Sequence, residues 1–283
     1  MQTLRKFAAL AATLTIACTI TSVQAKTWDK ITVATEGNYA PWNFTNSSGK
    51  LEGYEIDLTA ELCKRMNAQC TIVAQDWDGI IPGLNAGKYD AIIASMGVTA
   101  AREKAVAFSV PYAKAPNGFI AMKSNSLSKL PDLSKLFDLT QDEGAAKTEL
   151  EKLAPLLKGK VVGVQGGSTA AAFADKYLKP LLDVREYKTH EASVLDLASG
   201  RIDLVMSNIT VLQKSLSQPD MANATFTGPR FTGGVVGHGT ANVAIRKTDT
   251  DLQDKFNSAI KSVNEDGTNL RLMKKWFGLD LLP

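Results

Sequence analysis

Residues 89–103 read YDAIIASMGVTAARE, and this stretch decides the fold. Its first part, Tyr89–Ala94, is a mostly apolar run bounded by Gly87 and Gly97, which is typical of a strand buried on both faces of a sheet. Thr99 suits the N-cap of a helix that carries Arg102 in its first turn. The stretch therefore predicts a central strand of an α/β sheet, followed by a turn and a helix start.

The segments on both sides of this strand alternate strands with helices. Before it lie strand patterns at residues 31–34 and 71–73 and helix patterns at 56–66 and 77–86. After it, the order restarts with a strand at 160–164, a glycine turn, a helix at 170–178 and a strand at 202–206. We therefore predict an α/β protein with two lobes, each a mainly parallel sheet flanked by helices.

Less regular segments connect and follow these elements. Residues 124–143 are polar, contain Pro131 and show little periodicity, so they predict a surface excursion that leads into a helix at 145–157. Helix patterns return at 252–263 and 270–277. No repeat or coiled-coil pattern interrupts this order.

The composition is that of a globular protein that can bury a sizeable core. The chain has 283 residues, of which 45% are hydrophobic and 22% charged. Its formal charge of +3 comes from 32 basic and 29 acidic residues, and 30 basic residues remain when Arg5 and Lys6 are removed with the N-terminal segment. A nearly neutral body argues against nucleic acid as a partner.

The N-terminus has the pattern of a secretory signal peptide. Arg5 and Lys6 precede a mostly apolar segment at 7–20, and Val23-Gln24-Ala25 places small residues at the cleavage positions. We therefore expect removal of residues 1–25 and release into the periplasm. The alternative is a lipoprotein attached through Cys18, for which Thr15 is a poor fit.

Two cysteines remain after this cleavage. Cys63 and Cys70 lie in LCKRMNAQC, and an oxidising exported compartment permits a disulfide between them, which we expect. Two buried free thiols or a metal site are the alternatives, although no histidine or second cysteine pair lies nearby.

Two turns between a strand and a helix carry groups suited to an anion. Arg102 lies where the helix dipole disfavours a cation, so it needs an anionic partner, either Glu103 in a surface ion pair or a ligand carboxylate. The second turn, residues 166–169, offers backbone N–H groups and two hydroxyls in the other lobe. It lacks the spacing of a dinucleotide or P-loop motif. Two such turns favour one carboxylate ligand between the lobes.

Aromatic residues gather beside an acid after the first predicted strand. We expect Trp42 and Phe44 to be core residues, whereas Tyr39 and Trp77 lie in strand-end loops, where ligand sites collect. Aromatic rings beside the carboxylate of Glu36 suit a flat cation such as guanidinium.

Support for catalysis is weak. His190 and His238 are the only histidines, no G-x-S-x-G motif is present, and no Cys/His spacing fits a metal. The sequence predicts a binding protein without a metal or cofactor.

Several motifs in combination resemble one family. They are TEGNYAPW at 35–42, GYEIDL at 53–58, DAIIASM at 90–96, the Thr99-x-x-Arg102 turn, GRID at 200–203, and EDGT at 265–268 before Trp276 and Phe277. Over essentially the whole mature chain they are similar to the polar amino-acid periplasmic binding proteins, the solute receptors of ABC importers. The resemblance implies a monomer that delivers a small molecule to an inner-membrane ABC permease. It also implies two hinge crossings, with lobe 1 formed by 26–115 plus 240–283 and lobe 2 by 116–239.

Within this family, the receptors for the opines octopine and nopaline look most similar, followed by the basic amino-acid receptors. Basic amino-acid members usually carry a serine at the position of Gly97 and an aspartate, which pairs the ligand's α-ammonium, at the position of Asn208. An opine joins arginine to a second acid through a secondary amine. An opine therefore needs more room than a free amino acid, which Gly97 gives. It also needs a site without a buried anion beside its nitrogen, and the uncharged amide of Asn208 meets this need.

The resemblance also implies roles for individual residues. Glu36 would hold the guanidinium, with Tyr39 and Trp77 packed on the arginine stem. Arg102 would clamp a carboxylate. The remaining ligand contacts implied by the family are the turn Ala94, Ser95, Met96 and Gly97, the lobe 2 residues Gln165, Ser168 and Thr169, and Asn117 and Asn208. The position of His238 near the second crossing fits either hinge packing or ligand contact.

Two alternatives stay open at this point. One is a receptor for free arginine, lysine, ornithine or histidine. The other is an enzyme, since periplasmic dehydratases share this fold; their chemistry needs a well-placed acid, and Glu36 is the only evident candidate.

Overall fold

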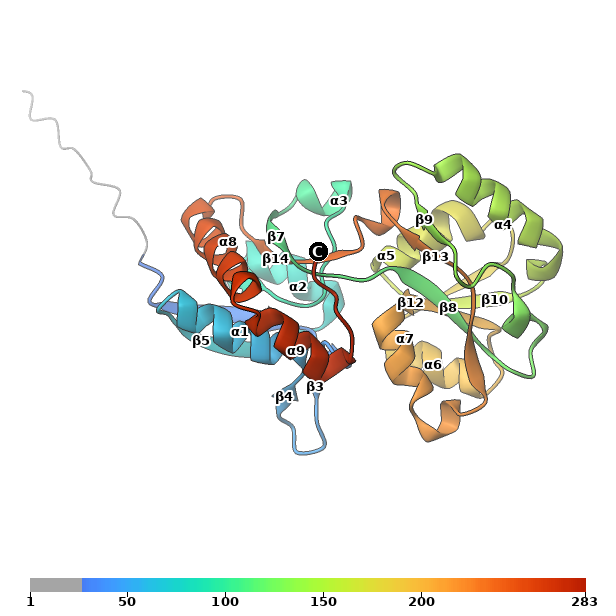
Figure 1. The fold of residues 1–283 in the computed structure, drawn as a ribbon, viewed down its shortest axis with the longest axis horizontal. Helices are drawn as coiled ribbons and strands as arrows, with labels where there is room; N and C mark the ends of the chain where they lie inside the picture. Colours follow the sequence, from blue (N-terminus) through green and yellow to red (C-terminus); the bar gives the residue numbers. More distant parts are fainter. Residues whose placement is uncertain (1–26) are drawn as a thin grey trace, which may run out of the picture.

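The computed structural model describes residues 27–283, so the predicted signal peptide and Cys18 lie outside the described residues. These residues form two α/β lobes, linked where the chain passes from β7 to β8 and returns from β13 to β14 (Figure 1). This confirms the predicted fold class. The division at residues 115/116 and 239/240 stays a prediction.

Lobe 1 contains a five-stranded sheet in the order β5-β1-β6-β14-β7. Its strands are β5 (Gln69–Ala74), β1 (Lys30–Thr35), β6 (Ala91–Ile92), β14 (Thr240–Ile245) and β7 (Ala107–Lys114). Its helices are α1 (Tyr54–Arg65), α2 (Trp77–Asn85), α3 (Ala100–Glu103), α8 (Thr250–Glu265) and α9 (Thr268–Phe277). A small sheet of β2 (Asn38–Tyr39), β3 (Asn43–Thr45) and β4 (Leu51–Glu52) lies beside it.

Lobe 2 contains a six-stranded sheet in the order β11-β10-β12-β8-β13-β9. Its strands are β11 (Asp183–Tyr187), β10 (Val161–Gln165), β12 (Leu204–Asn208), β8 (Asn117–Met122), β13 (Ala224–Thr232) and β9 (Leu136–Asp138). Its helices are α4 (Glu143–Leu157), α5 (Thr169–Phe173), which continues as a π-helical turn (Ala174–Leu178), α6 (His190–Ala198) and α7 (Ile209–Leu216). The short 3-10 helices are η1 (Ser126–Lys129), η3 (Pro219–Met221) and η4 (Gly234–Val236).

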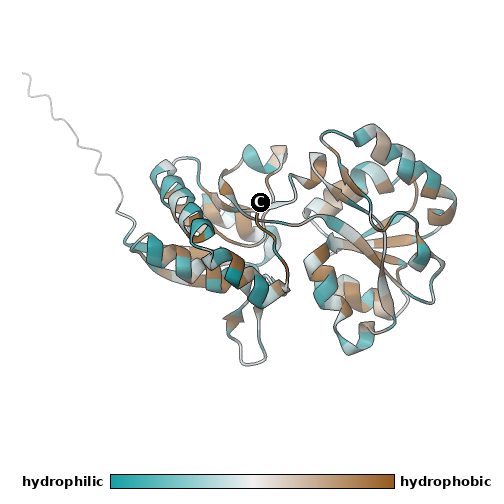
Figure 2. Ribbon diagram, viewed as in Figure 1, coloured by the Kyte–Doolittle hydropathy of each residue, from teal (hydrophilic) through white to brown (hydrophobic). Residues whose placement is uncertain are grey.

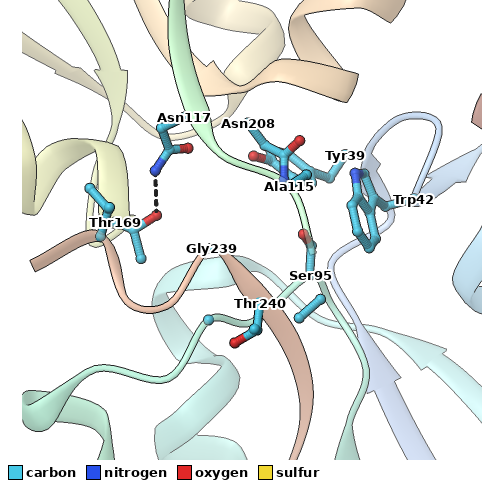
Figure 3. Close-up of a pocket in the computed structure, with 12 residues that line it drawn as sticks. Tyr39, Trp42, Ser95, Ala115, Asn117, Thr169, Asn208, Gly239 and Thr240 are labelled. Carbon is cyan, nitrogen blue, oxygen red and sulfur yellow. Dashed lines mark hydrogen bonds between the residues drawn. The ribbon is translucent and has the colours of Figure 1, made fainter. Parts of the chain in front are cut away.

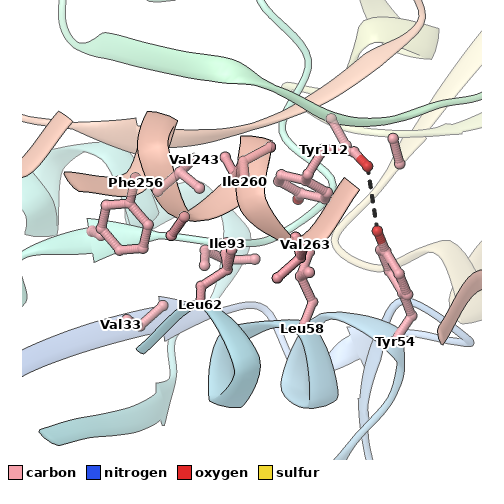
Figure 4. Packing of buried hydrophobic residues seen from close by; sticks show 14 of the residues in the cluster. Val33, Tyr54, Leu58, Leu62, Ile93, Tyr112, Val243, Phe256, Ile260 and Val263 are labelled. Carbon is pink, nitrogen blue, oxygen red and sulfur yellow. Dashed lines mark hydrogen bonds between the residues drawn. The ribbon is translucent and has the colours of Figure 1, made fainter. Parts of the chain in front are cut away.

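Successive side chains of each strand point to opposite faces of its sheet, and helices cover both faces. In lobe 1, Val33 and Ile93 pack with residues of α1 and α8 (Figure 4) and of α9. The neighbouring Ile92 packs with α2 on the other face of the sheet. In lobe 2, Phe119 packs with α4 and α5, and the adjacent Ile120 with α6 and α7. Figure 2 shows the hydrophilic residues on the outward faces of the helices. The continuous apolar runs in the sequence are thus strands buried on both sides.

The sheets are mixed, with a parallel part and an antiparallel part. In lobe 1, β1 pairs in parallel with β5 and β6, whereas β14 is antiparallel to both β6 and β7. In lobe 2, β10 is parallel to β11 and β12, but β8 is antiparallel to β12 and β13. The antiparallel strands are those that lead into and out of the two crossings.

Two predicted elements differ from the structure. The central strand β6 is limited to Ala91–Ile92, although Asp90 and Ile93 still donate backbone hydrogen bonds to β1 on either side. Residues 124–143 are more than a surface excursion, because they contain η1, with Leu127 fully buried, and the edge strand β9, which pairs with β13. A three-residue edge strand is too short to produce a visible alternation in the sequence.

Cys63 and Cys70 form the predicted disulfide. The sulfur atoms are 1.99 Å apart and the Cα atoms 6.1 Å apart. The bond links α1 to the edge strand β5 in lobe 1. It lies among the residues that pack between α1 and the sheet.

Candidate functional site

The site begins at the turn after β6. Ser95 adopts a positive φ of 49°, and its backbone N–H donates to Glu55 Oε1 at 2.5 Å. Thr99 caps the short helix α3 as predicted, since its hydroxyl oxygen accepts the N–H of Arg102 at 3.3 Å. Because α3 has only four residues, its dipole is small. Ala94, Ser95 and Gly97 of the preceding turn line the space between the lobes.

Arg102 points toward lobe 2 rather than toward a surface acid. Its guanidinium donates to the carbonyl oxygen of Gly97 at 2.9 Å and, across the lobes, to that of Gly167 at 3.1 Å. It also lies over the ring of Trp77, 5.1 Å from the centroid. Within residues 27–283 it forms no ion pair with Glu103 or any other carboxylate. Burial lowers its pKa to about 10, so it stays charged at neutral pH.

Glu36 supplies a buried carboxylate to the same space. It is 5% exposed, and its Oε1 accepts a hydrogen bond from Gln165 Nε2 of lobe 2 at 2.6 Å. Burial raises its pKa to about 7, partly offset by the Gln165 hydrogen bond, while Glu191, Glu55 and Asp76 add further negative charge. The surroundings therefore favour a cation beside Glu36.

The end of β12 and the start of α7 contact two aromatic residues of lobe 1. Tyr39 Oη and Ser207 Oγ are 2.9 Å apart, and Trp42 Nε1 donates to Thr210 Oγ1 at 2.8 Å. Asn208 caps α7, with its Oδ1 accepting from the backbone N–H of Thr210 at 3.0 Å and from its hydroxyl at 2.8 Å. No other side-chain hydrogen bond of Asn208 occurs among the described residues, so its Nδ2 is available to a ligand.

These residues line two adjoining pockets between the lobes. The first, shown in Figure 3, has about 40 Å³ of free volume. Its lining is Tyr39, Trp42, Ser95, Gly97, Ala115, Asn117, Thr169, Asn208, Val236, Gly239, Thr240 and Ala241. The second, of about 30 Å³, is lined by Glu36, Tyr39, Trp77, Ala94, Ser95, Arg102, Gln165, Ser168 and Thr169. The pockets share Tyr39, Ser95 and Thr169 and have room for only a few water molecules, so the lobes are closed.

The structure brings together nearly all of the residues predicted for the site. Met96 is the exception: it lines neither pocket, its side chain is fully buried in the lobe 1 core, and its carbonyl oxygen accepts the N–H of Asn242. The positive φ of Ser95 turns the chain at this point, and the side chain of Met96 packs into the core between the sheet and α2. His238 is exposed and lines neither pocket, so it neither packs in the hinge nor contacts this space.

Several lining residues were missed by sequence reasoning. Trp42 is fully buried, as expected for core, yet its edge also reaches the first pocket. The others, Ala115, Val236, Gly239, Thr240 and Ala241, lie at the two crossings. The only signal for them was their proximity to the crossings, because small apolar residues carry no chemical signature.

The chemistry of this space is that of recognition. It contains a carboxylate at Glu36, a guanidinium at Arg102, aromatic faces, and amide and hydroxyl groups, but no histidine. Over residues 27–283, no cluster of His, Cys, Asp and Glu side chains has the arrangement of a metal site. Nor does any helix in that range have the length and apolar character needed to cross a membrane.

Known proteins with similar sequences and structures share this architecture. The octopine-binding periplasmic protein of Rhizobium meliloti is 43% identical over 271 residues, which are 89% of this chain and 92% of that protein. The L-arginine-binding protein of Pseudomonas aeruginosa is 30% identical over 281 residues, 98% of each chain. A solved ancestral arginine-binding protein bound to arginine has a TM-score of 0.74 at 31% identity, covering 88% of this chain and 99% of its own.

The chain also matches a model that describes a whole protein family. The model that describes the bacterial extracellular solute-binding proteins of family 3 matches residues 31–279. This range includes every residue that lines the two pockets and, apart from Lys30, all of both large sheets. Together with the two-lobed fold and the cleft, this match shows that the chain belongs to the bacterial extracellular solute-binding proteins, family 3.

Proposed function

We propose that this protein is the periplasmic receptor of an ABC importer and binds an arginine-derived opine of the octopine or nopaline type between its lobes. One observation carries the proposal: Glu36 and Arg102 line the same pocket, yet within residues 27–283 neither forms an ion pair with the other. A ligand with a guanidinium at one end and a carboxylate at the other satisfies both charges.

The roles of the residues follow from this placement. Glu36 binds the guanidinium in place of Gln165, while Tyr39 and Trp77 pack against the arginine stem. Arg102 binds a carboxylate, assisted by the turn from Ala94 to Gly97. Ser168, Thr169 and Asn117 bind from lobe 2. Because the closed pockets are small, such a ligand enters while the lobes are apart and displaces the direct contacts between them.

Two positions favour an opine over a free amino acid. At Gly97, an added Cβ would lie 3.3 Å from the carbonyl oxygen of Thr240 and 3.6 Å from Thr169 Cγ2, so any side chain there takes space from the first pocket. At Asn208, both donors of Thr210 occupy Oδ1, which leaves the NH₂ group as the ligand contact. An amide donor suits a second carboxylate and does not suit an α-ammonium.

The similarity to an octopine-binding protein supports this ligand class. The alternative is a receptor for free arginine, lysine, ornithine or histidine, which the similarity to the L-arginine-binding protein of Pseudomonas aeruginosa favours. The opine hypothesis and the free amino-acid hypothesis both describe a receptor, and the relatives described above are named as binding proteins. We further propose cleavage of residues 1–25, a monomeric state, and an inner-membrane ABC permease as the partner that receives the ligand.

Titration calorimetry with octopine, nopaline, arginine, lysine, ornithine and histidine tests the proposal. We expect the highest affinity for one of the two opines and recovery of every ligand chemically unchanged. Highest affinity for a free amino acid would establish the alternative, and conversion of a ligand would indicate an enzyme on this fold. Binding of none of the six would overturn the proposed ligand class.

A further inference from the structure

Glu55, the second residue of α1, is a carboxylate with no exposed surface. Its Oε1 accepts the backbone N–H of Ser95 at 2.5 Å and the hydroxyl of Tyr112, and its Oε2 accepts Asn43 Nδ2 at 2.5 Å. Three donors from three separate segments therefore meet at one side chain. Glu55 itself lines neither cleft pocket.

The first of these segments is the turn that joins the two pockets. Ser95 lines both of them and adopts a positive φ, a conformation that a residue with a side chain rarely adopts. The hydrogen bond to Glu55 holds its N–H away from the cleft and so fixes which groups of the turn face a ligand. Burial raises the pKa of Glu55 to about 7, and above that pH the ionised carboxylate makes this a strong hydrogen bond.

The second segment carries Glu36 and Tyr39. The backbone N–H of Gly37 donates to Asn43 Oδ1 at 2.7 Å, and Asn43 in turn donates to Glu55. Asn43 thus links Gly37, the residue next to Glu36, to the carboxylate of Glu55 through two hydrogen bonds. The third segment is β7, where Tyr112 lies three residues before Ala115, a lining residue of the first pocket at the start of the crossing.

We propose that Glu55 is a positioning residue that, as the common acceptor of Ser95, Asn43 and Tyr112, holds the lobe 1 wall of the cleft in the shape that binds ligand. This inference rests on the proposed function, because it assumes that the cleft is the ligand site. It adds a residue that touches no ligand to those that do.

The direction of the hydrogen bonds makes a carboxylate necessary. Every partner of Glu55 is a donor, so an amide of the same size places its own NH₂ group against at least one of them. If the amide NH₂ faces Asn43, Asn43 must turn over, and its NH₂ group then meets the N–H of Gly37. Either way, a buried donor beside the cleft loses its acceptor.

The test compares Glu55→Gln with wild type and with Glu149→Gln. Glu149 is a matched control, since it is also a buried glutamate on a helix, but it lies on α4 of lobe 2, pairs with Lys152 at 3.3 Å, and lines neither pocket. Two quantities are measured: the affinity for octopine and arginine by calorimetry, and the amide proton shifts of Ser95 and Gly37 by NMR without ligand.

We expect Glu55→Gln to weaken binding by about 10-fold to 100-fold, as for the loss of charge-assisted hydrogen bonds. We also expect the Ser95 amide proton to move upfield in the free variant, while Glu149→Gln keeps both the wild-type affinity and the wild-type shift. Wild-type affinity in folded Glu55→Gln, or an unmoved Ser95 resonance, would overturn the inference.

A second variant, Glu55→Asp, tests the inference if Glu55→Gln does not fold. Glu55→Asp keeps the charge but withdraws it by one methylene, so we expect a smaller loss of affinity with the same direction of shift at Ser95. A folded Glu55→Asp protein with wild-type affinity and shift would overturn the inference. Failure of the proposed function looks different, because wild type itself would then bind neither ligand while the Ser95 and Gly37 shifts still responded to Glu55.

Discussion

The indole N–H of Trp42 in lobe 1 donates to the hydroxyl oxygen of Thr210 in lobe 2 at 2.8 Å. Since this oxygen already accepts a proton from Trp42, its own proton is directed to Asn208 Oδ1, 2.8 Å away. Contact between the lobes therefore helps to set the orientation of the Asn208 amide. The backbone N–H of Thr210 donates to the same oxygen at 3.0 Å, so a contact within lobe 2 and a contact between the lobes orient this amide together.

Asn208→Asp should weaken opine binding and improve binding of free arginine or lysine. An aspartate keeps the acceptor that caps α7, so the fold is preserved, but it replaces the NH₂ donor with an anion near the second carboxylate of the ligand. Like charges about 4 Å apart cost about 4 kcal/mol at an effective dielectric constant near 20. Paired titrations of wild type and variant with one opine and one basic amino acid measure both effects. Equal opine affinity in the two proteins would show that Asn208 does not face the ligand.

Arg102→Ala should abolish useful binding of any carboxylate ligand. Loss of the guanidinium leaves a carboxylate desolvated and unpaired, at a cost of about 2–5 kcal/mol. The variant also loses the hydrogen bonds of Arg102 to Gly97 and Gly167, so its melting temperature without ligand is measured beside its affinity. Arg65→Ala is the control, since Arg65 pairs with Asp266 on the surface of lobe 1 and should leave affinity unchanged. Calorimetry that finds wild-type affinity in Arg102→Ala would remove this residue from the site.

Gly97→Ser should weaken opine binding by about 1–3 kcal/mol through overpacking. The new side chain would press on the carbonyl oxygen of Thr240 and on Thr169 in the first pocket, where the second acid of the opine lies in our proposal. Gly144→Ser is the control, because an added Cβ there meets no atom within 4 Å. If opine affinity is the same in Gly97→Ser and Gly144→Ser, Gly97 is not part of the ligand site.

Affinity and stability should change in opposite directions with pH. Burial raises the pKa of Glu36 to about 7, above its ordinary value of 4.5, and the pKa of Glu55 is raised in the same way. Their contribution to stability is therefore fully present below pH 4.5 and is lost as the pH rises through about 7. Affinity for a guanidinium should instead rise over this window, as Glu36 becomes ionised.

Calorimetry and thermal unfolding between about pH 5 and pH 8 check this prediction. Glu36→Gln should bind more weakly at high pH and show a flatter pH dependence of affinity than wild type. An affinity of wild type that stays constant across this range would contradict the role of Glu36 as the guanidinium ligand.

A bound ligand should stabilise the protein by mass action. At a hundred times its dissociation constant, it adds about 2.7 kcal/mol to the free energy of unfolding, which corresponds to a rise in melting temperature of about 5–10 °C. Lysine acetylated at its α-amino group serves as a control that lacks the guanidinium. A melting temperature unmoved by every arginine-derived ligand would count against the proposed ligand class.

Features that depend on neighbouring residues could be predicted from the sequence. The helix cap at Thr99 follows from a hydroxyl placed three residues before a free backbone N–H. The apolar run around Ile92 and Ile93 predicted a strand buried on both faces. Such interactions involve residues a few positions apart, so local pattern is enough to predict them.

Pairing between distant segments was decided by the tertiary structure. Strands β7, β8, β13 and β14 were not predicted, and neither was the antiparallel pairing that they bring to each sheet. Gln165 meets Glu36 from 129 residues away, and Trp42 meets Thr210 from 168. A motif resemblance placed Glu36, Arg102 and Asn208 in one site, but it gave no hydrogen-bond partner for any of them.

The role of Glu55 shows the same limit most clearly. Its motif, GYEIDL, served only to indicate a family, and an acid in the first turn of a helix is ordinary. Only the folded chain brings Ser95, Asn43 and Tyr112 to this carboxylate, because α1, β3, β7 and the turn after β6 pack together in lobe 1. Sequence determines which groups donate and accept; the packing of segments far apart in the chain decides which of them meet.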